Sequence, residues 1–526
     1  MSPALPGRRF ALVSIAIVVL AGALRLPGFS RPAWLDETNS LTRVTDQTLV
    51  RMVRSSLADG NPPLYFVALR AWVAVFGPSD AAARFLSLVL TFGSLVVLLA
   101  TLGARSPPSG LSAGILFATN PLLVRYGTEI RSYALLVLLA LVAAAAAWRL
   151  AESPASRSAR AALLIAIPSA VLTHAAGVFL LPAIVAFVAV SAPRAERKRA
   201  LLAIAAPVAA GAAVFVALAA GFEALGRHKQ DWWIPTTTAG LVARCFGSLF
   251  GLPGWPAEGH ASHLALGAAM LVASVAFVIV SRERMAIAFL AGAGAFWASI
   301  VLTSLFAFPI VLDRTLLPAL PLFFSAMALA AFSRSFPERR PAFAAVLVIA
   351  LLWTNDVRAS FGRPIEDFRG AAIRIGGAYR AGDAILVFPG FAANALKRYL
   401  PGGAARAVRG IGDPEALSTI LADAALAKGE GDATAPTLNL VVRPGLDFRR
   451  TGNTLSSLLE AVASRAPRPP LRILLIEPID ALMAPEAARY RNEAVAAARK
   501  ALGEPDEEST NGLLYDARWH AEPACR

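Results

Sequence analysis

Residues 10–37 read FALVSIAIVVLAGALRLPGFSRPAWLDE, a long apolar run followed by two adjacent acids, Asp36 and Glu37. The apolar part, residues 10–26, approaches the length of a helix that crosses a bilayer. Charged and aromatic residues follow it in place of the small-residue cleavage site of a signal peptide, so we expect a retained helix. The acid pair therefore stands just beyond a membrane helix, in a chain that otherwise keeps carboxylates away from its apolar segments.

The composition of the 526-residue chain is that of a membrane protein. Hydrophobic residues make up 56% and charged residues only 16%, against about 25% charged residues in soluble domains, and the mean hydropathy is +0.59. The formal charge of +15 is concentrated in short links between apolar runs, at residues 8–9, 105, 149–160, 194–199, 282–284 and 334–340. Every second link is basic, as the positive-inside rule expects, so we expect no nucleic-acid partner. The two cysteines, Cys245 and Cys525, indicate no disulfide framework.

Placing Arg8 and Arg9 in the cytoplasm sets the direction of every later segment. We expect about eleven transmembrane helices, near residues 10–26, 82–102, 110–125, 132–149, 161–173, 176–191, 201–221, 264–281, 285–306, 315–332 and 342–354. Residues 1–354 then form a transmembrane domain with long outer loops at 29–81 and 222–263. Part of the first loop, residues 64–76, is apolar enough to lie against the membrane or dip into it.

The composition changes near Asn355, where charge rises and strand-like runs begin to alternate with helix-like runs. The strand-like runs start at Asp383, Leu438 and Arg472, and the helix-like ones cover residues 366–381, 413–427 and 484–502. Alternation of this kind predicts a small α/β domain with some parallel sheet in residues 355–526. An odd number of helices places this domain outside the cytoplasm. The predicted fold class is a polytopic α-helical membrane protein with a C-terminal extracytoplasmic α/β domain.

The distinctive polar residues all fall on the outer side of this topology. They are Asp36, Glu37, Asn61, Tyr65, Glu129, Arg131, Tyr133, His174, His228, Lys229 and Arg314. Each has an ordinary explanation by itself, such as a solvated turn, an arginine that snorkels to headgroups, a helix cap or loop charge. Burying ionisable residues at membrane depth costs free energy, however, and all of these residues lie on the outer side. Together they predict one polar site assembled from several outer links.

The ordered motifs Trp34-Leu-Asp-Glu, Asn61-Pro-Pro-Leu-Tyr, Glu129-Ile-Arg-Ser-Tyr, Thr173-His and Arg314-Thr-Leu-Leu-Pro-Ala-Leu-Pro resemble those of a known family. This family comprises bacterial membrane glycosyltransferases of the protein O-mannosyltransferase-like group, which are related to the lipid A aminoarabinose transferases. The resemblance implies a GT-C fold in the bacterial inner membrane, a sugar donor linked to polyprenyl phosphate, and inverting transfer outside the cytoplasm. Asn61 departs from the pattern, because many relatives have histidine before Pro-Pro. That weakens any acid/base or metal-binding role for this position.

Carried over residue by residue, Asp36 matches the proposed catalytic acidic residue, and Arg131 and Arg314 match basic residues near the donor phosphate. The chemistry agrees. Polyprenyl phosphate is a good leaving group, so the reaction needs a base for the acceptor hydroxyl and cations for the departing phosphate.

The other candidates have supporting roles. Glu37 is expected to orient Asp36 or bind the acceptor, and His228 and Lys229 are further candidates for the phosphate. The substrate-binding candidates are Asn61, Tyr65, Glu129, Tyr133 and His174.

The sequence has no Walker-type loop and no Rossmann fingerprint, so it indicates no nucleotide cofactor. A divalent cation held by Asp36, Glu37 or His174 stays open. The expected partners are the polyprenyl-phosphate sugar donor, membrane lipids, and a lipid, protein or cell-envelope glycan as acceptor. The main alternative is a transporter or flippase of lipid-linked glycans, a class that places its binding groups near the bilayer midplane and often shows repeat symmetry. A membrane-anchored scaffold or sensor is a third reading.

Overall fold

The computed structural model divides into two compact units. The larger, here called the membrane unit, comprises Met1–Arg31, Ser40–Trp255 and Gly259–Gly362, and the smaller, the α/β unit, comprises Pro32–Asn39, Pro256–Glu258 and Arg363–Arg526. The structure describes residues 7–224, 234, 236–250, 261–333, 340–361, 366, 368–380, 383–388, 390–410, 438–442, 459–460, 471–475, 484–502, 505, 507–509 and 512–515.

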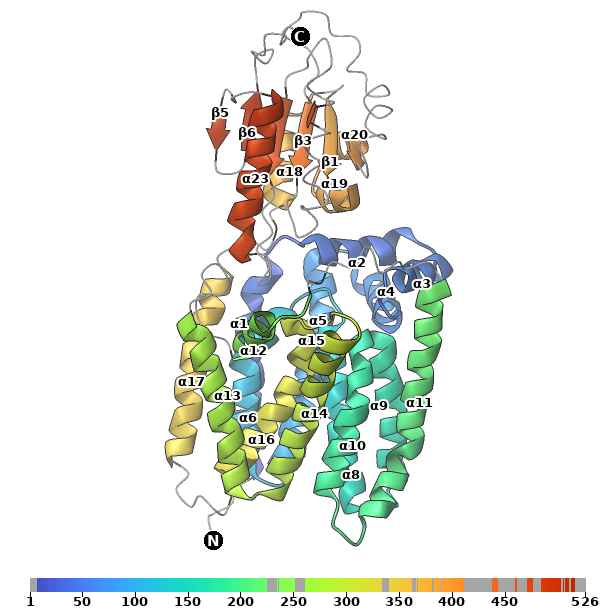
Figure 1. Cartoon of the computed structure of the whole chain (residues 1–526), viewed down its shortest axis with the longest axis vertical. Helices are drawn as coiled ribbons and strands as arrows, with labels where there is room; N and C mark the ends of the chain where they lie inside the picture. Colours follow the sequence, from blue (N-terminus) through green and yellow to red (C-terminus); the bar gives the residue numbers. More distant parts are fainter. Residues whose placement is uncertain are drawn as a thin grey trace, which may run out of the picture. The chain divides into compact units, whose positions relative to one another are not determined.

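The membrane unit is a bundle of helices (Figure 1). Its first half contains α1 (Gly7–Phe29), α2 (Leu35–Asp46, whose first residues belong to the α/β unit), α3 (Leu49–Ala58), α4 (Leu64–Phe76), α5 (Asp80–Gly103), α6 (Pro107–Thr119), α7 (Pro121–Tyr126), α8 (Tyr133–Glu152) and α9 (Arg157–Thr173). Its second half contains the 3₁₀ turn η1 (Ala175–Phe179), α10 (Leu180–Ser191), α11 (Arg197–Ala224), α12 (Ala239–Leu249), α13 (Ala261–Ser281), α14 (Arg284–Phe306), α15 (Asp313–Leu316), η3 (Leu317–Ala319), α16 (Leu320–Ala331) and α17 (Arg340–Ser360).

Each of the eleven segments expected to cross the membrane falls on one helix or on consecutive helices. Among the described residues, seven helical spans are long and apolar enough to cross a bilayer: α1, α5, α8, α11, α14, α17 and the run from α15 to α16. Leu64–Phe76, Ala175–Ser191 and Ala239–Leu249 are shorter apolar helices. The chain is thus a polytopic helical membrane protein.

Helix packing follows the apolar pattern of the sequence. α10 packs along α14, α8 along α9 and α5, and α6 is enclosed by α1, α5, α16 and α17. α5 and α6 approach so closely that a Cβ on Gly110 would lie 2.8 Å from the backbone nitrogen of Gly103, so this hairpin needs a residue without a side chain. α1 instead exposes apolar side chains such as Val19, 64% exposed, which suits contact with lipid.

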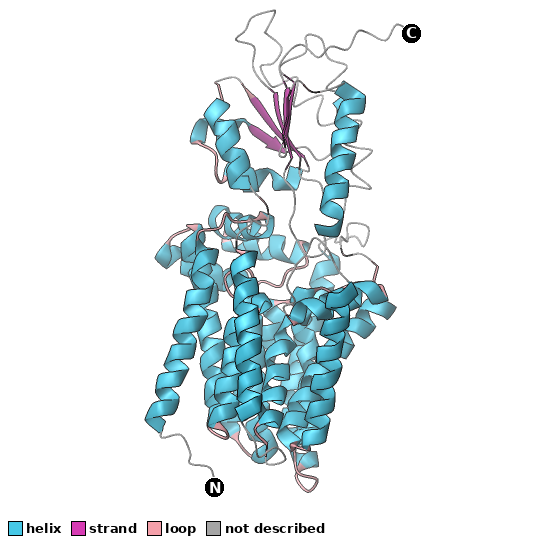
Figure 2. Ribbon diagram, turned by 90° about the vertical axis from the view of Figure 1, so that its left-hand side faces the viewer, coloured by secondary structure: helices cyan, strands magenta, loops and turns pink. Residues whose placement is uncertain are grey.

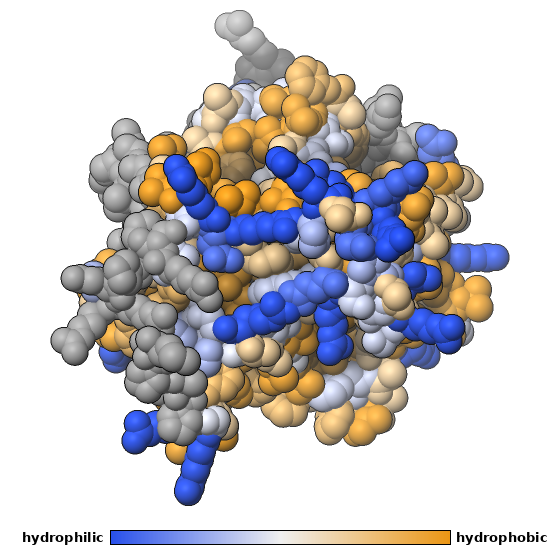
Figure 3. All heavy atoms as spheres, turned by 90° about the horizontal axis from the view of Figure 1, so that it is seen from below, coloured by the Kyte–Doolittle hydropathy of each residue, from blue (hydrophilic) through white to orange (hydrophobic). Residues whose placement is uncertain are grey.

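Two of the described basic links contact helix ends at one end of the membrane unit. Arg105, in the link after α5, forms an ion pair with Glu152 at the end of α8. The guanidinium of Arg284, at the start of α14, donates to the carbonyl of Val190 at the end of α10 (3.1 Å). Hydrophilic side chains cover this end of the unit and apolar ones surround them (Figure 3). One face thus carries the charge that the positive-inside pattern assigns to the cytoplasm.

The α/β unit is built around a six-stranded sheet in the order β2-β1-β3-β4-β6-β5. Its strands are β1 (Ala384–Phe388), β2 (Val408–Gly410), β3 (Leu438–Val442), β4 (Leu471–Leu475), β5 (Glu507–Ser509) and β6 (Gly512–Tyr515). β2, β1, β3 and β4 are parallel, with Leu386 paired to Leu440, whereas β6 runs antiparallel to both β4 and β5.

Helices lie on both faces of the sheet (Figure 2). The helical elements of this unit are α18 (Phe368–Ala378), the 3₁₀ turn η4 (Gly390–Ala392), α19 (Ala393–Lys397), α20 (Gly402–Ala407) and α23 (Ala484–Leu502). β1 and β3 are buried along their whole length, which explains why they read as continuous apolar runs in the sequence. The expected helix at residues 413–427 lies outside the described residues.

Candidate active site

The acid pair lies in the first turn of α2. Trp34 precedes the helix, and the Glu37 carboxylate reaches back to accept the Trp34 backbone N–H (Oε2 to N, 3.3 Å). A glutamate at the third helical position commonly satisfies the amide at the helix start in this way. Glu37 is 1% exposed, while Asp36 is half-buried. The two acids therefore differ in burial, and Glu37 caps the start of α2.

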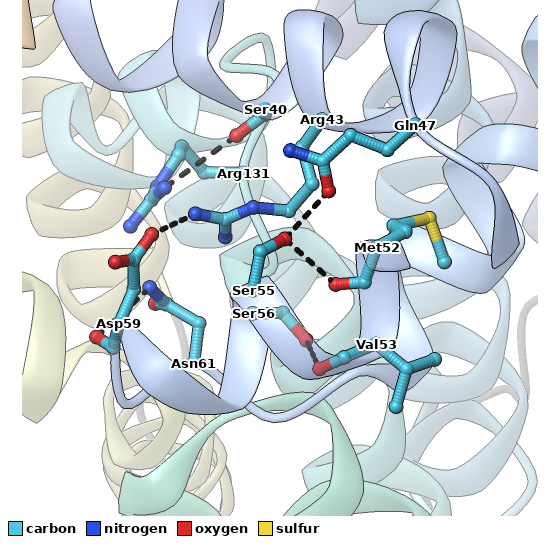
Figure 4. A network of polar contacts seen from close by, with 10 residues as sticks. All are labelled: Ser40, Arg43, Gln47, Met52, Val53, Ser55, Ser56, Asp59, Asn61 and Arg131. Atoms are coloured by element: carbon cyan, nitrogen blue, oxygen red, sulfur yellow. Dashed lines mark hydrogen bonds and ion pairs between the residues drawn. The ribbon is translucent and has the colours of Figure 1, made fainter. Parts of the chain in front are cut away.

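Arg131 lies in the short link between α7 and α8, in a polar network drawn in Figure 4. Its guanidinium donates to the Ser40 hydroxyl of α2 (3.5 Å), and its backbone N–H donates to the Glu129 carbonyl (2.8 Å). Arg43, one turn after Ser40, forms an ion pair with Asp59. In Figure 4 the side chains of Arg131, Asp59 and Asn61 face one another.

Asn61 closes the turn that ends α3. Its side-chain amide donates to the Asp59 carbonyl (3.3 Å), and its backbone N–H donates to the Ser56 carbonyl (2.8 Å). Gly60 allows this turn with a φ of 67°, a left-handed conformation that glycine adopts without strain. The contacts give Asn61 a structural role in the turn, and its substrate-binding role stays a prediction.

A second group of charges surrounds Tyr126 at the end of α7. Arg125 and Glu129 form a buried ion pair (Nε to Oε1, 3.0 Å). The Tyr126 hydroxyl donates to Asp313 Oδ1 (3.3 Å), and the same oxygen accepts the Arg314 backbone N–H (2.6 Å). Burial first, and then the neighbouring Asp313 charge, raise the pKa of Tyr126. This arrangement brings Arg314 close to the α7–α8 link, although 183 residues separate it from Arg131 in the sequence.

His174 connects the two groups. It lies between α9 and η1, outside the seven candidate spans, and its Nδ1 accepts the Ala176 backbone N–H (3.1 Å). Its ring lies 5.5 Å from that of Tyr133, which is 4.9 Å from that of Tyr126. Burial, and then the charges of Arg131 and Arg314, lower the His174 pKa to about 3. A neutral imidazole with an acceptor at Nδ1 carries its proton on Nε2 and can donate it to a ligand.

The structure thus brings Glu129, Arg131, Tyr133, His174 and Arg314 together within the membrane unit. Tyr65 belongs instead to an apolar cluster, with Leu41 of α2, Phe66 of α4 and Ile130. Because Ile130 precedes Arg131 directly, this cluster anchors the link that carries the arginine. His228 and Lys229 lie outside the described residues, and their phosphate-binding role stays a prediction.

Sequence reasoning missed Ser40, Arg43 and Asp59, and it placed Arg125, Tyr126 and Asp313 in the outer polar links without giving them a role in the site. The signal that could have assigned roles to Arg125 and Asp313 is their nearness in sequence to Glu129 and Arg314, since a charge within an apolar chain needs a partner. Among the described residues, no group of three histidine, cysteine, aspartate or glutamate side chains gathers in an arrangement that could hold a metal ion.

No protein-family model and no curated protein matches the sequence. Solved structures do match the fold. ArnT from Cupriavidus metallidurans in the apo state aligns with 89% of this chain and 93% of its own at a TM-score of 0.53 and 11% identity. The fold is that of ArnT. ArnT bound to undecaprenyl phosphate aligns with 90% of this chain and 94% of its own, at a TM-score of 0.50 and 13% identity.

The archaeal oligosaccharyltransferase AglB from Archaeoglobus fulgidus aligns with 98% of this chain and 75% of its own, at a TM-score of 0.49 and 13% identity. The likeness to ArnT shows a shared fold over most of both chains.

Proposed function

We propose that this chain is an inverting glycosyltransferase that moves a sugar from a polyprenyl-phosphate donor to an acceptor outside the cytoplasm. The observation that carries the proposal is that the links of Arg131 and Arg314, distant in sequence, meet around the half-buried His174, whose ring contacts that of Tyr133 and through it Tyr126. The ArnT fold supports it, since one ArnT structure holds undecaprenyl phosphate. The acceptor is a lipid, a protein hydroxyl or a cell-envelope glycan, and the membrane is the bacterial inner membrane.

The two arginines suit a phosphate that leaves with negative charge. A guanidinium stays charged at any working pH and presents paired N–H groups to phosphate oxygens. Both lie among buried groups, where fixed charges act on a developing anion more strongly than they would in water. His174 is neutral, so its Nε2–H can donate to the phosphate or to a sugar hydroxyl without adding charge.

The proposed step is a single displacement at the anomeric carbon. The Asp36 carboxylate accepts the proton of the acceptor hydroxyl as the acceptor oxygen bonds to that carbon. The bond from the anomeric carbon to the phosphate oxygen breaks at the same time, and its electron pair leaves with polyprenyl phosphate. Arg131 and Arg314 offset the charge of the leaving group. One displacement inverts the configuration, and Glu37 keeps the first turn of α2 in place.

The test compares Asp36→Asn with Asp46→Asn in the full-length protein. Asp46 lies on the same helix and is exposed, so its change is a matched control. Glycolipids and glycoproteins from cells that make each variant are compared by mass spectrometry. We expect the sugar increment to vanish with Asp36→Asn and to persist with Asp46→Asn. Normal transfer by folded Asp36→Asn would remove Asp36 from the role of base.

A transfer assay with purified protein and added polyprenyl-phosphate donor tests the phosphate contacts. Arg131→Ala and Arg314→Ala should each raise the donor KM, because each removes a charged contact to the phosphate. Unchanged donor kinetics in both variants would contradict the assignment.

Metal dependence is a separate test. Since the two arginines already offset the phosphate charge, we expect transfer to continue when EDTA removes divalent cations. Loss of activity that a divalent cation restores would instead indicate a metal held by Asp36, Glu37 or His174.

A further inference from the structure

Two side chains of the α/β unit bind the backbone that leads into α2. The Tyr399 hydroxyl accepts the Ala33 backbone N–H (2.6 Å), and Glu366 Oε2 accepts the Leu35 backbone N–H (2.9 Å). Ala33 is fully buried, and Glu366 is 1% exposed. These contacts join positions that are 366 and 331 residues apart in the chain.

The start of α2 needs such partners. Leu35 is the first helical residue, and the first amides of a helix have no acceptor within the helix. Trp34 stands at the capping position but has no side-chain oxygen with which to accept one of these amides. Instead, the Glu37 carboxylate accepts the Trp34 backbone N–H, and the Glu366 carboxylate accepts the Leu35 backbone N–H. Two carboxylates at a helix N-terminus also interact favourably with the helix dipole.

Packing holds the same segment. Trp34 and Leu35 belong to the hydrophobic core of the α/β unit, together with Phe368 of α18, Ile385 of β1 and Leu396 of α19. The guanidinium of Arg369 lies over the Tyr399 ring, 5.2 Å from its centroid. This cation–π contact favours one orientation of the phenol that accepts from Ala33.

We propose that the α/β unit positions the general base, with Glu366 and Tyr399 as positioning residues for Asp36. The inference rests on the proposed function for the role of Asp36. Asp36 follows Leu35 directly, so the contacts that fix the amides of Ala33 and Leu35 also fix the backbone that carries the carboxylate. A small misplacement of a reacting group slows chemistry far more than it weakens binding.

The experiment uses full-length Tyr399→Phe, Glu366→Ala and Glu366→Gln. Tyr379→Phe is the matched control for the tyrosine, because Tyr379 packs against the same core. Glu460→Gln at an exposed site controls for the glutamate. Hydrogen exchange of residues 32–39 is measured by mass spectrometry, alongside kcat and the donor KM.

We expect faster exchange of residues 32–39 in Tyr399→Phe and Glu366→Ala, and a fall in kcat on the order of tenfold to a hundredfold with little change in donor KM. Glu366→Gln keeps an acceptor oxygen, so its exchange and kcat should lie between those of Glu366→Ala and the wild type. Both control variants should match the wild type.

Unchanged kcat in Glu366→Ala and Tyr399→Phe, with Asp36→Asn inactive, would overturn the positioning role and leave the proposed function standing. A donor KM that rises while kcat holds would also overturn it. A wild-type protein without transferase activity would overturn the proposed function itself, and exchange at residues 32–39 would still report whether Glu366 and Tyr399 hold the segment.

Discussion

At the scale of single residues, the clearest contrast is between two Arg–Glu ion pairs. Arg125 and Glu129 pair with side chains 9% and 5% exposed, whereas Arg105 and Glu152 pair with side chains 51% and 40% exposed. Glu129→Gln removes the carboxylate that pairs with the buried Arg125 guanidinium, and we expect the free energy of unfolding to fall by about 3 kcal/mol or more. Glu152→Gln should cost under about 1 kcal/mol, because water already solvates both groups.

Chemical denaturation in detergent micelles measures both variants under the same conditions. Equal losses for the buried and the exposed pair would contradict the burial argument.

His174 makes the stability of the membrane unit depend on pH. Its folded pKa is lowered to about 3, while an unfolded histidine titrates near 6.5. Between these values the unfolded state binds a proton that the folded state does not, so stability falls as the pH drops from about 6.5 toward 3. His174→Gln removes this contribution. We expect its unfolding temperature to fall less than that of the wild type between pH 7.5 and pH 5, as scanning calorimetry can measure.

An equal fall in both proteins would show that His174 does not carry this dependence.

At the scale of elements, the break between α6 and α7 positions the link that carries Arg131. The sequence predicts one helix near residues 110–125, but the helix stops at Asn120, whose ψ is 124° and whose side chain accepts the Leu123 backbone N–H. Pro121 has no N–H to continue the α6 ladder. The guanidinium of Arg25, fully buried in α1, donates to the carbonyls of Ala118 (3.1 Å) and Leu123 (3.0 Å) on the two sides of the break.

Gly127 tests this packing. A Cβ there would lie 2.8 Å from Arg25 Nε, 2.8 Å from Thr91 Oγ1 and 2.7 Å from the Leu123 carbonyl. Gly127→Ala should therefore destabilise the protein by about 1–3 kcal/mol. Gly294→Ala in α14 is the matched control, because a Cβ there meets nothing within 4 Å, and alanine is the better helix former. Thermal unfolding compares the two, and a Gly127→Ala variant as stable as Gly294→Ala would contradict this account.

The helical segments could be predicted because long apolar runs need no information from distant residues. The run at residues 10–26 lies inside α1, and the strand-like runs that begin at Asp383 and Leu438 contain β1 and β3. Prolines in the segments 110–125 and 315–332 indicate helix breaks, but the apolar pattern predicts one continuous helix in each segment. The contact of Glu366 with Leu35 could not be predicted, because a hydrogen bond across 331 residues leaves no local pattern. For the same reason, the segment at Pro32–Asn39 was not assigned to the α/β unit.

At the scale of the whole molecule, charge asymmetry predicts orientation. Basic links follow α5, α8 and α10, and Arg105 and Arg284 have partners at neighbouring helix ends of the same face. Lysine and arginine in short links favour the cytoplasmic side, so that face of the membrane unit (Figure 3) should be cytoplasmic. Gly362 ends this unit after α17, and the predicted count of eleven crossings places it on the other side.

A topology reporter fused after residue 362 should therefore read as extracytoplasmic, and one placed at residues 153–156, between α8 and α9, should read as cytoplasmic. Signals from the same side at both positions would require an even number of crossings between them. An even number of crossings would contradict the predicted location of the α/β unit, including Asp36, outside the cytoplasm.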